Sequence, residues 1–143
     1  MIRKATLNDL EWIDQLSREN FETSFSKESL KNMIVEEETY HIFLAEKKEF
    51  IGYVIIWESD TFGQIVDIVV KNEYQGLGYG RALLDYGLNY LKDMGIDTIS
   101  LEVKVSNTRA IKLYESKGFI LDHTIKNYYK EEEGYFYIMK REK

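Results

Sequence analysis

A glycine-rich turn between a predicted strand and a predicted helix is the feature that most restricts how this chain can fold. The stretch "YQGLGYGRALL", residues 74–84, holds three glycines at alternate positions. It follows the apolar, β-branched run "GQIVDIVV", which predicts a buried strand, and it precedes leucines that recur at helical spacing. Because the first N–H groups of a helix have no partner within it, they would all point into one concavity beside the glycines.

Such a turn is suited to binding a phosphate. The helix dipole adds about half a positive charge at the N-terminus, and glycine lets an anion reach the backbone without meeting a Cβ. Arg81 lies in the same turn. The alternative is a tight turn that needs glycine only for its backbone shape.

The remaining predicted elements alternate between strands and helices. Helices are expected after Asn8–Asp9 and after Ser26, whose side chains suit helix caps. Trp12, Ile13 and Leu16 share the side of the first helix that should face the core. Strands are predicted at residues 2–5, 41–46, 50–57, 63–70, 98–105, 119–129 and 134–140, and further helices that end at Gly95 and Gly118. This order predicts a mixed sheet covered by helices on both faces.

Size and composition limit the classes of function. The chain has 143 residues, 44% of them apolar and 14% aromatic, so we expect residues 1–143 to form one domain with a buried core. The absence of cysteine excludes a disulfide framework, a thiolate metal site and a cysteine nucleophile. His41 and His123 lie far apart and no metal-binding spacing is present, so we expect no metal.

Charge and hydropathy argue against nucleic acid and membranes as partners. The net charge of -6 argues against nucleic acid as a partner, because binding to phosphate backbones rests on clustered Lys and Arg. It leaves room for a cationic substrate. The chain opens without a long apolar segment, so we expect no signal peptide, no membrane span and a cytoplasmic protein.

Two stretches resemble blocks of the GNAT family of N-acetyltransferases. The pattern Gln75-x-x-Gly78-x-Gly80 after "IVDIVV" is similar to that family's loop for the pyrophosphate of acetyl-CoA, and "LEVKVSNTRAIKLYESKGF" resembles its later block. The resemblance implies the GNAT fold: an α/β fold, α+β in some schemes, with a single mixed, mostly antiparallel sheet of about seven strands with helices on both faces. It also implies acetyl-CoA as co-substrate and no metal.

The same resemblance implies which residues bind the co-substrate. They are Ile68, Val69, Val70, Gln75, Gly76, Leu77, Gly78, Tyr79, Gly80, Arg81 and Asn107. Ile68 and Val70 would hold pantetheine through their backbone groups, as an added strand is held, and Ile68 would also offer an amide to the thioester oxygen. Their side chains alone indicate only a buried strand.

Within the family, the chain most resembles the bacterial ribosomal-protein alanine N-acetyltransferases. Those enzymes are assigned a glutamate base and a tyrosine acid at the spacing of Glu102 and Tyr114, and "NYY" at residues 127–129 adds to the likeness. The resemblance implies direct acetyl transfer to the N-terminal alanine of a small-subunit ribosomal protein, whose basic tail would be the partner of a monomer or weak dimer. Relatives commonly carry a proline near the position of Phe25 and another before the glycine loop, and this chain has none.

The predicted strand at residues 98–105 places Glu102 on the face opposite Ile99, Leu101 and Val103. A plainly solvated face is the alternative. Because helices should cover both faces of a central strand, we expect Glu102 to be partly buried, as suits a general base that acts directly or through a water.

Asn107 and Tyr114 lie two helical turns apart, so they project from similar sides of one helix. Asn107 would contact the pantetheine or phosphate arm, and Tyr114 would place its hydroxyl near the sulfur. The alternatives are a helix cap for Asn107 and simple packing for Tyr114.

The acceptor amine is the least determined part of the prediction. A free α-amine has a pKa near 8 and a lysine near 10.4, so an N-terminal substrate asks less of a base. Acidic runs at 36–38 and 131–133 would attract a basic tail or are solvated loops, and Tyr128 and Tyr129 would wall the peptide site or pack the hairpin. A small amine such as a polyamine, a protein lysine, and a non-catalytic acetyl-CoA-binding module remain alternatives.

Overall fold

The computed structural model describes residues 1–21, 24–36, 38–129 and 132–141, with the backbone alone for residues 127–129. Its strands are β1 (Ile2–Lys4), β2 (Tyr40–Glu46), β3 (Phe50–Ser59), β4 (Phe62–Val70), β5 (Thr98–Lys104), β6 (Ile120–Tyr129) and β7 (Glu132–Lys140). Its helices are α1 (Leu10–Asn20), α2 (Lys27–Glu36), α3 (Tyr79–Asp93) and α4 (Thr108–Ser116), with short 3-10 turns at Leu7–Asp9 and Asn72–Tyr74. The order of elements is the one that the sequence predicts.

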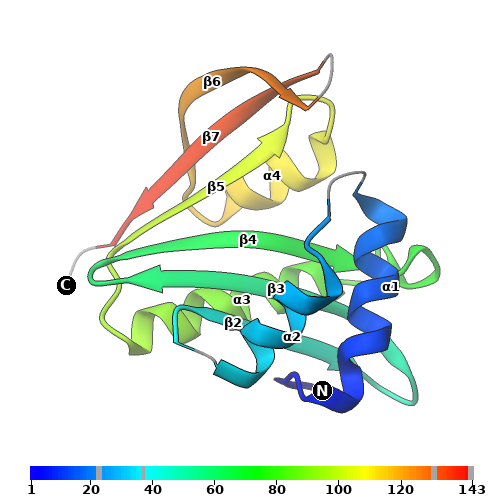
Figure 1. Cartoon of the computed structure of the whole chain (residues 1–143). Helices are drawn as coiled ribbons and strands as arrows, with labels where there is room; N and C mark the ends of the chain where they lie inside the picture. The colour runs from blue at the N-terminus through cyan, green and yellow to red at the C-terminus, as the bar shows by residue number, and fades with distance from the viewer. Residues whose placement is uncertain (22–23, 37, 130–131, 142–143) are drawn as a thin grey trace.

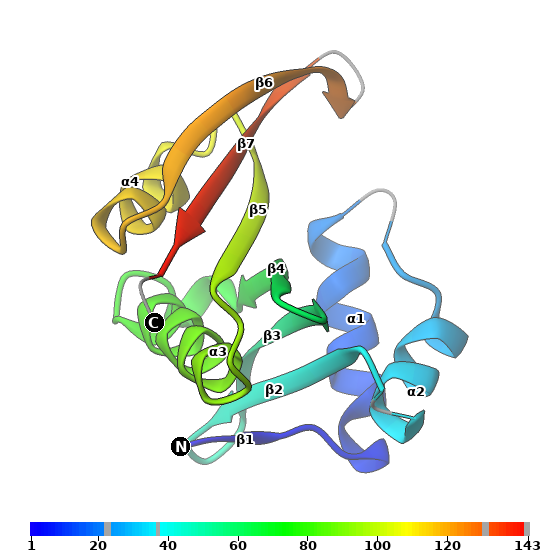
Figure 2. The same ribbon diagram turned by 90° about the vertical axis from the view of Figure 1, so that its left-hand side faces the viewer.

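The strands form one seven-stranded sheet in the order β1-β2-β3-β4-β5-β7-β6. All neighbours are antiparallel except β4 and β5, which run parallel. The predicted mixed, mostly antiparallel sheet is therefore confirmed. Helices α1 and α2 cover one face, and α3 and α4 lie on the other (Figures 1 and 2).

The core is divided by the sheet into two apolar layers. Val54 and Ile56 of β3 pack with the α3 leucines, whereas Tyr53 and Ile55 pack toward α1 and α2. Because successive side chains of a strand point to opposite faces, β3 is buried on both. The strand prediction at residues 50–57 rests on this continuous apolar run.

The sheet splits between β4 and β5. Their ladder joins only Phe62–Ile65 to Thr98–Leu101, and the two strands diverge beyond it (Figure 1). A β-bulge in β4 accompanies the split, since the register with β3 shifts from Ile56↔Ile65 to Ile55↔Asp67. A bulge bends its strand and increases the local twist, so it directs the end of β4 away from β5.

The first helix differs from the prediction in two respects. Asp9 is the N-cap residue of α1, as predicted, but its side chain makes no capping hydrogen bond, because a 3-10 turn at Leu7–Asp9 with Thr6 as its own N-cap precedes the helix. Ile13 and Leu16 are buried as predicted, but Trp12 is 52% exposed and stacks on Phe50 at the rim. Helical spacing identifies a side of the helix but not how far the neighbouring sheet extends beneath it.

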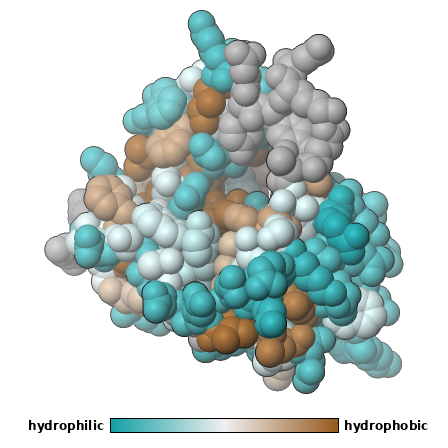
Figure 3. Space-filling view, in the orientation of Figure 1, coloured by the Kyte–Doolittle hydropathy of each residue, from teal (hydrophilic) through white to brown (hydrophobic). Residues whose placement is uncertain are grey.

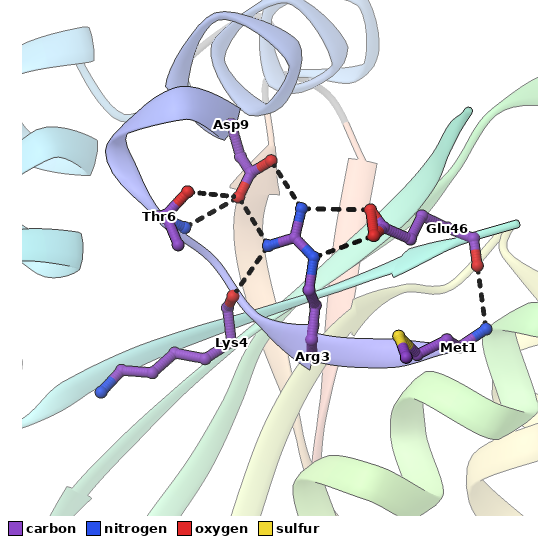
Figure 4. A network of polar contacts seen from close by, with 6 residues as sticks. All are labelled: Met1, Arg3, Lys4, Thr6, Asp9 and Glu46. Atoms are coloured by element: carbon purple, nitrogen blue, oxygen red, sulfur yellow. Dashed lines mark hydrogen bonds and ion pairs between the residues drawn. The ribbon is translucent and has the colours of Figure 1, made fainter. Parts of the chain in front are cut away.

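Arg3 ties the first strand to the first helix (Figure 4). Its guanidinium donates hydrogen bonds to both carboxylate oxygens of Asp9, at 2.9 Å each, and to Glu46 at 2.9 and 3.1 Å. Asp9 also accepts from the backbone N–H of Thr6 at 2.8 Å. Burial alone would raise the pKa of Asp9, but the bonds from Arg3 and Thr6 outweigh it and lower that pKa.

Candidate active site

A cleft of about 590 Å³ opens where β4 and β5 part. Its lining residues are Asn20, Phe21, Ser24, Phe25, Gln64, Val66, Asp67, Ile68, Val69, Val70, Gln75, Glu102, Val103, Lys104, Asn107 and Tyr114. Most of the face seen in Figure 3 is hydrophilic, and hydrophobic residues show near its middle, where Figure 1 shows β4 and β5 apart. The cleft brings together the predicted residues of β4, Gln75, Asn107 and both catalytic candidates.

The glycine turn continues from the end of β4 into α3. Gly76 has a φ of 81° and Gly78 a φ of 94°, in the left-handed region that favours glycine, and Gly78 is the N-cap of α3. A Cβ at Gly78 would meet no other atom within 4 Å. The turn therefore needs its glycines for backbone shape and also leaves open space before the helix, so it fits the pyrophosphate of acetyl-CoA.

Two side chains hold the turn in place. Gln75 donates from Nε2 to the carbonyl oxygen of Val70 at 3.0 Å and to Asn72 Oδ1 at 3.2 Å. Tyr79 packs edge-on against Tyr74, with ring centroids 5.9 Å apart. Leu77, in contrast, is 68% exposed at the tip of the turn. Gln75 and Tyr79 thus shape the loop, whereas the side chain of Leu77 between them faces outward.

Arg109 is a residue that the sequence reasoning missed. One of its guanidinium nitrogens, Nη2, lies 4.0 Å from where a Cβ of Gly76 would stand. It comes from the first turn of α4, across the cleft from the glycines, and is exposed. A second cation therefore stands beside the turn, in addition to Arg81 in the first turn of α3. Its position two residues after Asn107 was the available clue.

The β4 edge offers backbone rather than side chains. Val69 and Val70 are buried, and Ile68 packs against the α3 layer. Beyond Ile65 the described part of β5 forms no ladder with this strand. Apart from the Val70 carbonyl, which accepts from Gln75, the backbone groups on that side are open to an added strand, as the resemblance implies for pantetheine.

Glu102 lines the cleft but is exposed, so the expectation of partial burial is wrong. The reason is the split of the sheet. Leu101 is the last residue of β5 that pairs with β4, so at Glu102 the neighbouring strand has already turned away. The carboxylate faces the open cleft, where the prediction placed a covering helix.

Asn107 and Tyr114 serve as a helix cap and a packing residue, the alternatives left open for them, and both also line the cleft. Asn107 caps α4, accepting from the N–H of Ala110 at 3.3 Å, and also lines the cleft. Tyr114 packs edge-on against Phe119, with centroids 6.1 Å apart, and lines the same cleft as Glu102. Packing and exposure to the cleft are therefore compatible at each residue.

Asp67 is the second residue that the sequence reasoning missed. It lines the cleft from β4 and is half-buried, and burial raises its pKa to about 7. The clue in the sequence is a single acid within the apolar run "IVDIVV". Such a group can change its protonation state near neutral pH.

Other predicted features fall partly outside what the structure describes. Glu37 and Glu131 of the acidic runs lie outside the described residues, and so do the side chains of Tyr128 and Tyr129. Within the described ranges, no group of three His, Asp or Glu side chains could hold a metal ion. No helix in those ranges is long and apolar enough to cross a membrane.

Comparisons with known proteins agree with this geometry. The model of the acetyltransferase (GNAT) family matches residues 6–119. An N-alpha-acetyltransferase of Sulfurisphaera tokodaii is 33% identical over an alignment covering 92% of this chain and 87% of that protein. The ribosomal protein bS18-alanine N-acetyltransferase of Escherichia coli is 40% identical over 59% of this chain and 54% of its own length.

A solved structure confirms the predicted fold. The crystal structure of the ribosomal-protein-S18-alanine N-acetyltransferase from Escherichia coli matches with a TM-score of 0.85 at 25% identity, covering 98% of this chain and 92% of that one. The predicted resemblance is thus confirmed at the level of sequence and of fold. The chain belongs to the acetyltransferase (GNAT) family and is an N-acetyltransferase.

Proposed function

We propose that the chain acetylates the N-terminal alanine of a small-subunit ribosomal protein, by direct transfer from acetyl-CoA to the α-amine. The observation that carries the proposal is a single cleft containing the open edge of β4, Glu102 and Tyr114. The similar Escherichia coli proteins are named as N-acetyltransferases of such an alanine. The likeness of this chain to them supports the same substrate class here.

The chain's own groups would bind the co-substrate in an extended form. N–H groups of the turn at residues 76–81 and the guanidinium of Arg109 would hold the phosphates, and the backbone of Ile68 and Val70 would hold pantetheine. Asn107, at the mouth of α4, would contact the same arm. When bound, acetyl-CoA supplies a thioester whose carbonyl carbon an amine can attack.

Proton transfer would fall to the two side chains at the cleft. Glu102 would accept a proton from the substrate amine, directly or through a water, and Tyr114 would protonate the departing sulfur. The N–H of Ile68 would donate to the carbonyl oxygen as negative charge develops on it. Together these groups meet the proton balance of amide formation from a neutral amine.

A basic tail has a path away from the cleft. Phe25 lines the cleft and also a second hollow of about 350 Å³, whose other lining residues include Glu36 and Glu38. Both carboxylates are exposed and the chain has a net charge of -6. A peptide whose first residue lies in the cleft and which continues past Phe25 would place its basic residues beside these acids.

Mass spectrometry on two peptides tests the proposal. One basic peptide begins with a free alanine, and the other has that amine blocked but keeps its lysines; each is incubated with protein and acetyl-CoA. Acetylation of the free N-terminus alone is the expected result. Acetylated lysines in the blocked peptide would make the chain a lysine acetyltransferase, and transfer to neither peptide, but to spermidine, would make it a small-amine enzyme.

A further inference from the structure

The β-bulge in β4 determines which way Asp67 faces. Ile65 packs in the α3 layer, but after the bulge Asp67 stands opposite Ile55, which packs toward α1 and α2. Glu102 also faces that side, because its neighbours Leu101 and Val103 belong to the α3 layer. Two carboxylates from two diverging strands therefore line one cleft from the same side of the sheet.

No described side chain donates a hydrogen bond to the Asp67 carboxylate, although it is half-buried in an apolar strand. A buried polar group close enough to feel its charge is Tyr53 on β3, whose hydroxyl has no hydrogen-bond partner among the described residues. A carboxylate withdrawn from water without a partner is unfavourable. Its position is explained if a ligand supplies the missing positive charge or donor.

Several charged or titratable groups share the surroundings of Asp67. Tyr53 faces it from β3, and the charge of Asp67 adds to burial in raising the pKa of Tyr53. Asp14 of α1 acts on Tyr53 in the same sense and is paired with Arg18 at 3.0 Å. Among the residues that the structure describes, the other charged or titratable groups of the cleft are Glu102, Lys104 and Tyr114.

Acetylation of an ammonium ion needs more than one proton acceptor. The nitrogen of an R–NH₃⁺ group loses one proton before its lone pair can attack the thioester carbon, and a second as the C–N bond forms and the C–S bond breaks. The sulfur takes one proton as a thiol leaves, so one proton is released overall. A single exposed carboxylate would have to discharge its first proton before it could accept the second.

We propose that Asp67 is a second catalytic residue of this cleft, which binds the substrate ammonium through its carboxylate and accepts the first proton, leaving the second to Glu102. This inference rests on the proposed function and specifies the substrate as a primary ammonium ion. Burial raises the pKa of Asp67 to about 7. An α-amine has a pKa near 8, so the transfer runs against a difference of only about tenfold.

The pH dependence of kcat in matched variants tests the proposal. The Asp67→Asn protein keeps the shape of the side chain, Glu102→Gln removes the other acceptor, and Asp60→Asn is a control at an exposed turn outside the cleft. For wild type and Asp60→Asn we expect kcat to fall on the acid side of pH 7, at a midpoint lower than that of the free enzyme, because kcat reports the substrate complex and a bound ammonium lowers the pKa of Asp67. Asp67→Asn should lose that limb, with kcat at pH 7.5 lower by about tenfold or more and acetyl-CoA affinity within about twofold of wild type. If Asp67→Asn retains the limb and a wild-type kcat, the proposal is wrong.

A second measurement is independent of turnover. The carboxyl carbon signal of Asp67 in labelled wild-type protein should titrate near pH 7, and saturation with an alanine-amide peptide should lower that midpoint, because a bound ammonium favours the charged carboxylate. Titration near pH 4, or a midpoint that the peptide leaves unchanged, contradicts the role of Asp67. Because this measurement uses wild-type protein, it tests the role of Asp67 even if the Asp67→Asn variant fails to fold. A wild-type protein that acetylates no N-terminus refutes the proposed function, while the peptide-induced shift still decides the role of Asp67.

Discussion

Two glycines, one at each end of α3, allow a role in phosphate binding to be distinguished from a role in backbone shape. Gly78 before the helix has a φ of 94° and Gly95 after it has a φ of 82°. A Cβ at either position would meet no other atom within 4 Å, so an alanine would fit sterically. Only Gly78 belongs to the turn at the end of the cleft, which makes Gly95→Ala a matched control for Gly78→Ala.

Both alanine variants should lose similar stability. A non-glycine residue in the left-handed region costs about 1 to 2 kcal/mol, and neither site adds a clash. Urea denaturation should therefore place both variants about 1 to 2 kcal/mol below wild type.

Acetyl-CoA binding should separate them. In Gly78→Ala the new methyl group stands in the space before the helix where the pyrophosphate would approach the N–H groups. Calorimetry should show Kd raised about tenfold or more, a loss of about 1.4 kcal/mol. Gly95→Ala should bind like wild type. Equal affinities for the two variants would refute the phosphate-binding role and leave the glycines as turn residues only.

Three further predictions concern the rest of the fold. Asp9→Asn should reduce stability by about 2 kcal/mol at pH 7. Because the folded pKa of Asp9 lies below 3.8, the difference in stability from wild type should shrink when denaturation is measured at pH values falling through that pKa. A difference that stays constant down to pH 2 would contradict the ion-pair account. Gly52→Ala should lower the free energy of unfolding in urea by about 3 kcal/mol, since its Cβ would lie 2.4 Å from the carbonyl oxygen of Val69. A loss below 1 kcal/mol would show that β3 and β4 shift to accommodate the Cβ at little cost. Arg109→Ala should weaken acetyl-CoA binding several-fold in low salt and less in high salt, because an exposed cation acts through a screened charge; an unchanged Kd in low salt would remove Arg109 from the phosphate site.

Local patterns predicted the elements well because their causes are local. The glycines at 95 and 118 end helices with φ of 82° and 98°, as the sequence suggests. Ser26 caps α2 by accepting from the N–H of Ser29 at 3.0 Å. The apolar run of β3 predicts burial on both faces, and both faces are buried. Each of these features depends on residues within a few positions of one another.

The features that were missed depend on tertiary structure. Strict alternation would place Ile65, Asp67 and Val69 on one face, but the bulge moves Ile65 into a different layer from the other two. Glu102 is exposed because β4 turns away from its strand at that point. Arg109 gains its relevance from a glycine loop more than thirty positions earlier in the chain, across a cleft that neither segment forms alone.

The most direct test of the central claim compares two tyrosine hydroxyl deletions. Tyr114→Phe removes the proposed acid from the cleft, and Tyr86→Phe removes a hydroxyl from the partly exposed side of α3, outside the cleft. With an alanine-initiated basic peptide, Tyr114→Phe should lower kcat about 100-fold or more while the Kd for acetyl-CoA stays within about twofold of wild type. Tyr86→Phe should match wild type in both. Full turnover by Tyr114→Phe would show that the cleft does not transfer acetyl groups in the way proposed.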